Sequence, residues 1–465
     1  MIRRRDLFLS AAAFSLPASV RLSASGRTSP IYQHENVLGT SLEMRFDSSA
    51  PAQAEAAALA EIDRLANILS SYNASSEFNR WTRTRHDPVP VSPELMEVLG
   101  LYDEWRARSG GAVNAAFSAP FNAQLGAETL HWQLDRQNGT ATHLTDAPLV
   151  LNSFTKSYII NRAADAAMRH ASGAMVNIGG DLVVKGRASE LVHIVNPLND
   201  TENSAPLATI RAAKLAVATS GNSRRGAHIV DPRTGGRPSH ILSATVTAPN
   251  ATDAGALATA FTVLTVAESR ALAARTPGVE YMLVRHGGEV VRSAGWRSLL
   301  LAPAAQIQAR SEVAHEVIVN LELARIEGQR YRRPYVAVWV EDKDKFPVRT
   351  VALWLEKDRW LPELKGWYRD DRLRLLAEGN EIVATVSSAT RPPGKYTMKW
   401  DGKDAKGAPV KPGKYTICIE VAREHGSYQL LRQEIDLTAG AKQFPLTGGT
   451  EIAAASIDYR KNTSR

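Results

Sequence analysis

The chain has 465 residues, of which 44% are hydrophobic and 22% charged, and its formal net charge is +8. This length exceeds what one hydrophobic core usually serves, so we expect two folded units. The 56 lysines and arginines are scattered and form no basic stripe. The composition therefore argues against a disordered chain, and we expect no nucleic-acid partner.

The N-terminal segment has the features of an export signal. Three arginines at positions 3–5 precede a short apolar run, and small residues between Ser19 and Gly26 offer a cleavage site. Paired arginines favour the twin-arginine route, with a frayed basic tail as the alternative. The apolar run is too short for a membrane span, and no later segment approaches the length needed. We expect residues 1–27 to be removed and the remainder to be a soluble, exported periplasmic protein.

Residues 32–299 mix helices and short strands. Helical spacing of apolar residues predicts a helix over 52–69, and Ser92 followed by Pro93 predicts another that ends near Ser109. Two further helices are expected over 158–170 and within 255–274. Strand-sized apolar runs lie at 174–178, 182–185, 191–195, 242–248 and 281–284. This order indicates an α+β domain.

After Trp296 the pattern becomes one of strands alone. Residues 300–312 are expected to form a linker, because small residues dominate there without a clear pattern. Strands are predicted at 317–323, 335–340, 350–355, 382–386, 396–400, 415–421 and 429–437. Several short strands separated by turn signals predict an all-β, immunoglobulin-like sandwich domain over residues 313–460.

Four segments of the first domain carry residue types suited to chemistry. They are the hydroxyl- and amide-rich turn at 70–79, the Gly-Gly-Asp turn at 176–181, the run at 218–232 and the strand, turn and helix start at 243–259. Paired glycines allow a backbone to approach a ligand closely, or simply allow a tight turn. Taken singly, each segment is more often structural than functional.

Taken together and in this order, the segments resemble the FAD:protein FMN transferase family over residues 36–299. The resemblance is carried by Val37–Thr40, Ser71-Tyr72 with Ser76-Glu77, Ser109–Ala112, Lys156–Tyr158, Val176–Asp181 and His228–Pro232. Such an enzyme moves FMN from FAD onto a threonine hydroxyl of an acceptor protein, and AMP leaves. A divalent cation, normally Mg²⁺, polarises the phosphate.

The resemblance also implies roles for particular residues. His228 is the candidate acid/base group, because a histidine pKa of about 6.5 suits proton transfer near neutral pH. The residues implied to bind the flavin nucleotide are Tyr72, Asn114, Lys156, Asp181 and Ile229. The residues implied to hold the metal are Thr155, Asp253 and Thr259.

This chain departs from the family pattern at important positions. Asn114 and Val150 stand where the family has aspartates, and Gly255 replaces the aspartate of the metal motif Ala-Asp-Ala-x-Ala-Thr. Asp253 lies six residues before Thr259, roughly 240° around a helix, so it cannot face the same ion. The Mg²⁺ site is therefore in doubt. We expect Gly255→Asp alone to restore the carboxylate at little cost to the helix.

The second domain resembles a periplasmic β-domain that occurs beside flavin-linked membrane reductases, on the residues from Arg333 to Asp342 and from Ala389 to Asp404. The sequence thus favours an FMN transferase that modifies an exported or membrane electron-transfer protein. The alternative is a catalytically degenerate flavin-binding or accessory protein that docks onto a membrane redox complex. A structural two-domain scaffold explains Lys156, Asp181 and His228 less well.

Overall fold

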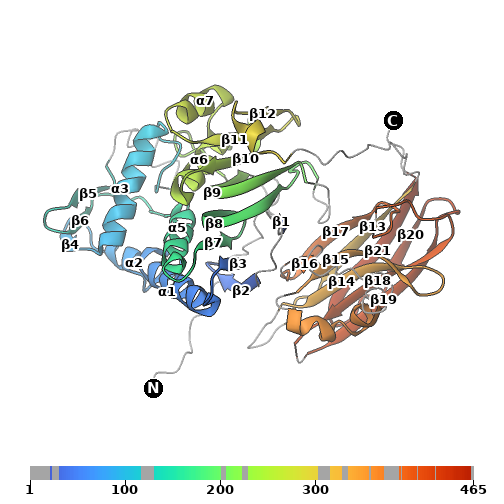
Figure 1. The fold of residues 1–465 in the computed structure, drawn as a ribbon. Helices are drawn as coiled ribbons and strands as arrows, with labels where there is room; N and C mark the ends of the chain where they lie inside the picture. The colour runs from blue at the N-terminus through green and yellow to red at the C-terminus, as the bar shows by residue number, and fades with distance from the viewer. Residues whose placement is uncertain are drawn as a thin grey trace, which may run out of the picture. The chain divides into compact units, whose positions relative to one another are not determined.

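The computed structural model describes residues 21–23, 31–116, 130–199, 206–221, 229–301, 315–326, 333–355, 358–370, 387–388, 390–405, 407–424 and 426–461. The chain divides into two compact units (Figure 1). The first consists of residues 1–198 and 208–301, and the second of residues 199–207 and 302–465. Each unit has a hydrophobic core of its own.

A large antiparallel sheet forms the centre of the first unit. Its strands follow the order β12-β11-β10-β9-β8-β7-β3-β2, and β1 pairs with β8. The strands are β1 (Arg21–Ser23), β2 (Ile31–Val37), β3 (Thr40–Asp47), β7 (Gly173–Ile178), β8 (Asp181–Ile194), β9 (Ala208–Gly221), β10 (Ile241–Ala248), β11 (Glu280–Arg285) and β12 (Val290–Arg292). The tight β7–β8 turn places Asp181 at one end of this sheet.

Helices α1 (Pro51–Leu69), α5 (Thr155–Met168) and α6 (Ala251–Val263) cover one face of the sheet (Figure 1). Helix α5 packs against α1, α6, β7 and β8, whereas α6 packs against β9 and β10. Helix α6 is apolar on nearly all sides and is buried along most of its length, as expected for a helix enclosed by other elements. The α5–α6 contact is thus formed by closely packed backbones.

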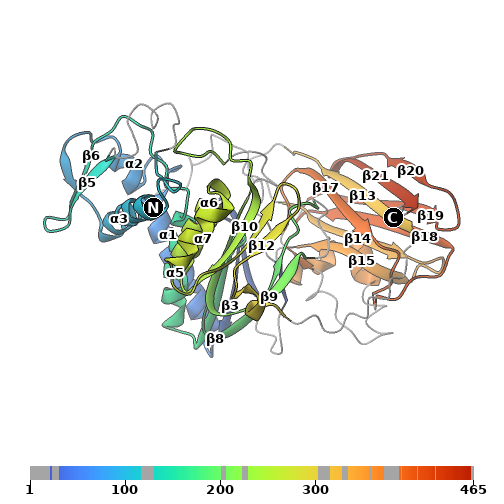
Figure 2. The same ribbon diagram turned by 90° about the horizontal axis from the view of Figure 1, so that it is seen from above.

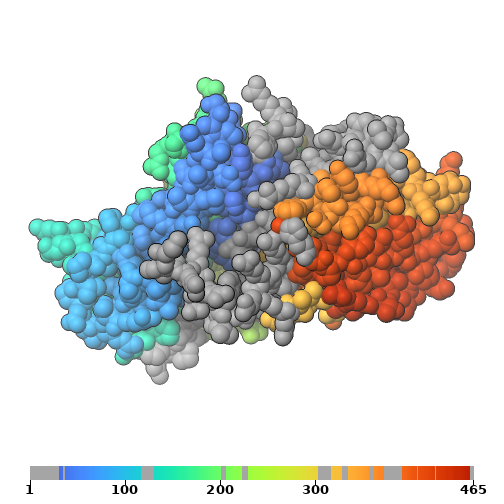
Figure 3. Space-filling model, turned by 90° about the horizontal axis from the view of Figure 1, so that it is seen from below, coloured from blue at the N-terminus to red at the C-terminus, as the bar shows by residue number. Residues whose placement is uncertain are grey.

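The remaining elements of the first unit lie around this core. They are α2 (Glu77–Trp81), β4 (Pro88–Pro90), α3 (Pro93–Arg108), β5 (Trp132–Asp135), β6 (Thr140–His143), α7 (Val266–Ala274) and α8 (Trp296–Leu299). Strands β4, β6 and β5 form a small separate sheet. The surface contributed by α1, α2 and α3 is seen in blue and cyan in Figure 3.

The helices at 52–69 and 93–108 form as the sequence predicts, and the Ser92 hydroxyl caps α3 by accepting from the Leu95 amide at 3.2 Å. The expected helix within 255–274 is instead two helices, because Thr265 and Glu268 form a capping box that starts α7. The runs 182–185 and 191–195 belong to one strand, β8, which a register shift between Val184 and Ser189 interrupts. Strand β9 was not predicted.

The second unit consists mainly of two sheets that share one core, which gives two layers of strands (Figure 2). One sheet has the order β17-β13-β21-β20 and the other β16-β15-β14-β18-β19. The strands are β13 (His315–Leu323), β14 (Tyr335–Glu341), β15 (Pro347–Trp354), β16 (Ser387–Ser388), β17 (Gly394–Trp400), β18 (Lys414–Ala422), β19 (Tyr428–Asp436), β20 (Lys442–Leu446) and β21 (Ile452–Lys461). The β-rich character expected after Trp296 is confirmed.

Other expectations for this part of the chain have mixed outcomes. Strands β20 and β21 were not predicted, and the strand expected at 382–386 lies outside the described residues, as does most of the expected linker. A short 3₁₀ helix, η1 (Asp358–Glu363), adds to the second unit. Among the described residues of the whole chain, no helix is both long and apolar enough to cross a membrane.

Candidate functional site

The turn after α1 presents Tyr72 at the surface. The Ser76 hydroxyl caps α2 by accepting from the Asn79 amide at 3.1 Å, and it donates to the Ser70 carbonyl at 2.7 Å. The Asn79 side chain donates to the carbonyls of Ser70 and Asn73 at 3.0 and 2.8 Å. These bonds fix the turn, within which Tyr72 is 62% exposed.

The same turn holds the segment that leads into α5. The Leu151 amide donates to the Ser71 hydroxyl at 2.9 Å, and the Asn152 side chain donates to the Tyr72 hydroxyl at 2.8 Å. Residues far apart in sequence are therefore adjacent here. The sequence motif that contains Tyr72 thus helps to position the start of α5.

Helices α3 and α6 hold the next residue of this segment. The Ser153 amide donates to the Tyr102 hydroxyl at 3.1 Å, and the Ser153 carbonyl accepts from Thr259 Oγ1 at 2.8 Å. Burial raises the pKa of Tyr102 to about 12, so its hydroxyl stays protonated at neutral pH. The Thr155 side chain is buried beside the Tyr102 hydroxyl.

Lys156, in the first turn of α5, points to the end of the sheet. Its Nζ lies 3.2 Å from Asp181 Oδ2, and the Ser157 hydroxyl donates to the same oxygen at 3.2 Å. The Thr219 amide of β9 approaches Asp181 Oδ1 at 3.4 Å. Both glycines before Asp181 adopt left-handed backbone conformations, with φ of 62° and 97°. The turn therefore brings this carboxylate onto the first residues of α5.

Gly255 lies where α6 meets α5, directly against Ser157. A Cβ atom at Gly255 would lie 2.7 Å from Ser157 Cβ and 3.5 Å from Phe154 Cβ, and it would overlap Ser157 Oγ. The expectation that Gly255→Asp alone restores a carboxylate at little cost is therefore wrong. The position of the family's aspartate is already filled by the serine hydroxyl of the neighbouring helix.

Asp253 lies in the first turn of α6 and is hydrogen-bonded to Asn250, the N-cap residue of that helix. Asn250 Oδ1 accepts from the Asp253 amide at 2.9 Å, and Asn250 Nδ2 donates to Asp253 Oδ2 at 2.8 Å. The three residues expected to hold a metal thus have other surroundings: Asp253 at this cap, Thr259 on the Ser153 carbonyl and Thr155 beside Tyr102. Mg²⁺ prefers several anionic oxygens, and the described residues contain no cluster of three histidine, cysteine, aspartate or glutamate side chains that could hold a metal ion. This donor set does not fit a divalent cation.

The other expected nucleotide-binding residues have varied settings. Asn114 Oδ1 accepts from the Ala116 amide at 3.0 Å, within a segment whose Ala115 carbonyl accepts from Val150. Ile229 is partly buried and packs against the main core. His228, the expected acid/base residue, lies outside the described residues.

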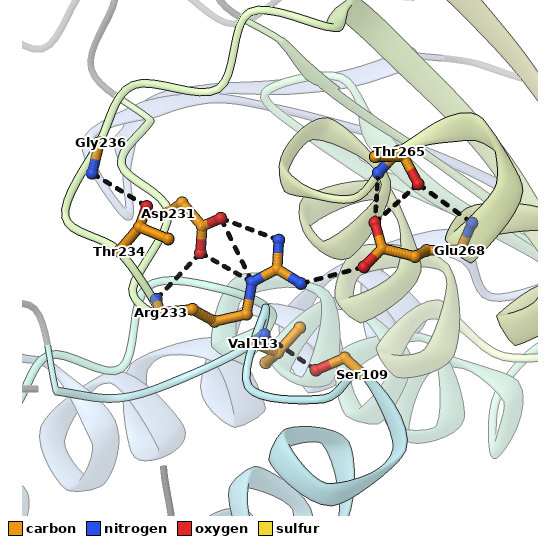
Figure 4. Close-up of polar contacts among 8 residues, drawn as sticks. All are labelled: Ser109, Val113, Asp231, Arg233, Thr234, Gly236, Thr265 and Glu268. Carbon is orange, nitrogen blue, oxygen red and sulfur yellow. Dashed lines mark hydrogen bonds and ion pairs between the residues drawn. The ribbon is translucent and has the colours of Figure 1, made fainter. Parts of the chain in front are cut away.

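A pocket of about 210 Å³ lies beside the segment that follows Ile229. It is lined by Asp231, Arg233, Thr234, Gly236, Arg237, Pro238, Ser239, His240, Val263 and Thr265. Asp231 is buried and holds Arg233 through Oδ1–Nε and Oδ2–Nη2 contacts of 2.9 and 2.8 Å (Figure 4). Arg233 Nη1 also contacts Glu268 Oε1 at 3.3 Å, which ties the loop to the capping box of α7.

A glycine turn lies against the same arginine. Gly110 and Gly111 follow α3 with φ of 59° and 86°, and a Cβ atom at Gly111 would lie 3.3 Å from Arg233 Cγ. The Ser109 hydroxyl accepts from the Val113 amide at 3.0 Å and closes this turn (Figure 4). Sequence reasoning missed Arg233, because the Thr-x-x-Glu pattern at Thr265 indicates a helix start but not the distant loop residue that contacts it.

Comparisons with known proteins agree with this arrangement of motifs. A profile of the ApbE family matches residues 38–283, which is more than half of the chain. The chain belongs to the ApbE family. FAD:protein FMN transferases of Treponema pallidum (strain Nichols) and Klebsiella pneumoniae (strain 342) are 28% and 26% identical to it over 314 and 311 residues. These alignments cover 56% and 58% of this chain and 86% of each relative.

A solved ApbE structure and a second family profile account for the two units. The crystal structure of the ApbE protein from Thermotoga maritima matches with a TM-score of 0.52 at 21% identity and covers 59% of this chain and 100% of that one. Its likeness shows that the first unit has the ApbE fold. Residues 316–454 match a family described as predicted periplasmic protein, DUF2271. The resemblance of the first domain to the FMN transferase family and that of the second domain to a periplasmic β-domain are thus confirmed.

Proposed function

We propose that this chain is an FAD:protein FMN transferase. The acceptor threonine oxygen attacks the phosphorus of the FMN half of FAD, and the bond between that phosphorus and the AMP oxygen breaks. A phosphoester links FMN to the acceptor, AMP leaves, and the hydroxyl proton passes to a base. His228 is the residue that we propose for this proton transfer, because the run that contains it matches the family motif.

The observation that carries this proposal is the convergence of separate motifs on the start of α5. Side chains from the turn after α1, from α3 and from α6 all bond the segment 151–153. The result is a fixed helix N-terminus with Lys156 in its first turn, which suits an anionic group of a nucleotide. The ApbE family match, over residues 38–283, spans this whole region, and the curated relatives are FAD:protein FMN transferases by name.

Individual residues then have separate tasks in the proposed site. Tyr72 offers an exposed aromatic face on which a flavin or adenine ring can stack. Lys156 supplies positive charge, and Asp181 orients Lys156. No step is assigned to Mg²⁺, because the side chains at the family's metal position do not fit it.

We infer that the second unit brings the transferase to its acceptor in the periplasm, as an immunoglobulin-like module that docks onto a membrane redox complex. The match of residues 316–454 to a predicted periplasmic family supports this location. The arginine-rich start supports export through the twin-arginine route. Replacing Arg4 and Arg5 by lysine is expected to retain the protein in the cytoplasm, which fractionation and immunoblotting measure. Unimpaired export would contradict the route.

The activity is tested with purified full-length chain, FAD and a membrane fraction as the source of acceptor. We expect AMP to appear in the same molar amount as protein-bound flavin that survives denaturing electrophoresis. Mass spectrometry is expected to locate the flavin on a threonine, and His228→Ala is expected to abolish both products. FAD binding without AMP release would favour the non-catalytic flavin-binding alternative. Failure to bind FAD would contradict the flavin assignment itself.

A further inference from the structure

Two departures from the family pattern meet in one contact. Ser157 stands at the glycine of the family's Ala-Lys-Gly-Tyr run, and Gly255 stands at the aspartate of its metal motif. The two residues face each other across the α5–α6 contact, and the space for a side chain at position 255 is occupied by that of Ser157. In the family pattern the side chain at this contact comes from α6, whereas in this chain it comes from Ser157 of α5.

This difference from the family pattern changes the charge at this end of α5. A carboxylate at position 255 would add a negative charge, whereas the serine hydroxyl is neutral and donates to Asp181. In the described structure, the carboxylate at this end of α5 is that of Asp181. The Lys156 ammonium forms an ion pair with it, with Nζ 3.2 Å from Oδ2. Both groups are partly buried, with side-chain exposures of 29% for Lys156 and 14% for Asp181. A divalent cation would have to displace the ammonium and would gain few anionic ligands.

We propose that this chain holds the diphosphate of FAD with the Lys156 ammonium in place of a divalent cation, and that Ser157 and Gly255 form a matched pair that closes the cation position. This inference rests on the proposed function. Lys156 lies in the first turn of α5, where the helix dipole and the ammonium both favour an anion. Ser157 keeps Asp181 oriented toward Lys156, which fixes the position of the ammonium.

Binding measurements on the full chain test the role of the ammonium. FAD and ADP are expected to bind equally well in EDTA and in Mg²⁺, as measured by calorimetry. Lys156→Gln is expected to weaken both ligands roughly ten- to a hundredfold, the range for a charge-assisted hydrogen bond, and to leave riboflavin binding unchanged. Lys156→Arg is expected to retain most of the affinity. Lys185→Gln, which removes another Lys–Asp pair of the same unit, is the matched control.

Metal titration tests the matched pair without reference to activity. Mn²⁺ binding, followed by electron paramagnetic resonance, is expected to be absent in the natural chain and in Gly255→Asp, and to appear in the double variant Ser157→Gly/Gly255→Asp. Gly255→Asp alone is expected to lower the melting temperature, and the second substitution is expected to restore it.

Several results would overturn the inference. Stoichiometric Mn²⁺ binding by the natural chain would do so, as would loss of FAD affinity in EDTA or metal binding by Gly255→Asp alone. If the double variant does not fold, the EDTA and Lys156→Gln measurements decide the question by themselves. FAD binding that requires Mg²⁺ would contradict this inference and leave the transferase proposal intact, whereas the absence of FAD binding would contradict the transferase proposal.

Discussion

Tyr72 is the residue whose exposed surface is hardest to explain by packing alone. Tyr72 is 62% exposed, although its hydroxyl accepts from Asn152 and several hydrogen bonds fix the turn around it. A ring that is held in place but left open loses little conformational entropy when a ligand stacks on it. This combination is typical of a binding platform.

We predict that Tyr72→Ala weakens FAD binding roughly tenfold, as expected for the loss of one aromatic stacking contact. Tyr72→Phe keeps the ring and is expected to retain most of the affinity. Flavin fluorescence quenching measures both variants. Tyr428→Ala removes an exposed tyrosine of the second unit and serves as the control. Equal affinities of Tyr72→Ala and the natural chain would exclude Tyr72 from the flavin site.

Single residues also show what the sequence could and could not predict about the site. Lys156 and Asp181 were assigned to one nucleotide site from their motifs, and the structure places Lys156 Nζ 3.2 Å from Asp181 Oδ2, although their binding role stays a prediction. The consequence of Gly255 was not foreseen, because the obstacle is a serine on another helix. Helix propensity gives the cost of a glycine-to-aspartate change from α6 alone. In a closely packed interior, that cost also depends on the side chain that faces the position, here Ser157.

At the scale of elements, the loop after Ile229 depends on a buried carboxylate. Asp231 is 8% exposed, holds Arg233 through two oxygens, and its carbonyl accepts from the Gly235 amide at 2.7 Å. Arg233 in turn reaches Glu268 at the start of α7. Arg233 therefore joins a loop, a helix cap and one wall of the pocket through two ion pairs.

We predict that Asp231→Asn lowers the free energy of unfolding by about 2 kcal/mol, because charge-assisted hydrogen bonds of a buried group are lost. Urea unfolding followed by circular dichroism measures the change. The matched control is Glu289→Gln, which breaks the exposed pair with Arg285 and is expected to cost less than about 1 kcal/mol. Similar losses for the two variants would show that the Asp231 pair has no special structural role.

A second element-scale feature is a group of buried carboxylates in the second unit. Glu341, in β14, is 1% exposed, and its carboxylate accepts from Trp339 Nε1 and contacts Arg432 Nη1, both at 2.9 Å. Burial raises the pKa of Glu341, and the nearby Asp370 carboxyl raises it further. Burial likewise raises the pKa of Glu420 in β18.

A raised pKa means that the folded unit retains protons that the unfolded chain releases. The contribution of these groups to stability is therefore full below about pH 4.5 and is lost as the pH rises through their folded-state values. We predict that Glu341→Gln, which imitates the protonated acid, gains stability relative to the natural chain as the pH rises. Thermal unfolding between pH 4 and pH 8 measures this. Glu434→Gln, on the surface of β19, is the control, and parallel curves for Glu341→Gln and the natural chain would contradict the prediction.

The elements that the sequence predicted well are those with complete local signals. Helix α3 has its Ser92 cap and Pro93 start, and the strands of the second unit alternate or follow turn residues. The break between α6 and α7 was missed because both helices are rich in alanine and the capping box at Thr265 was overlooked. Strand β8 was divided in two because its two apolar runs are separated by the mainly polar residues 186–190, which read as a connection when only the sequence is seen.

At the scale of the whole molecule, the division into two units leads to a further prediction. Each unit contains its own core, and the second unit resumes after Leu301. We predict that limited proteolysis cuts within residues 300–312 and yields two resistant fragments. Fragments covering residues 31–301 and 315–461 are expected to unfold cooperatively when expressed separately, as measured by calorimetry. Resistance to cleavage there, together with insolubility of the separate fragments, would contradict this.

The contact between Ser157 and Gly255 also restricts the order in which the two positions can be changed. A chain with glycine at position 157 and aspartate at position 255 cannot accept the serine first, because the two side chains would occupy the same space. Loss of the aspartate first would leave two glycines and no clash at this contact. Restoring the family pair in the laboratory must follow the reverse order, with Ser157→Gly before Gly255→Asp.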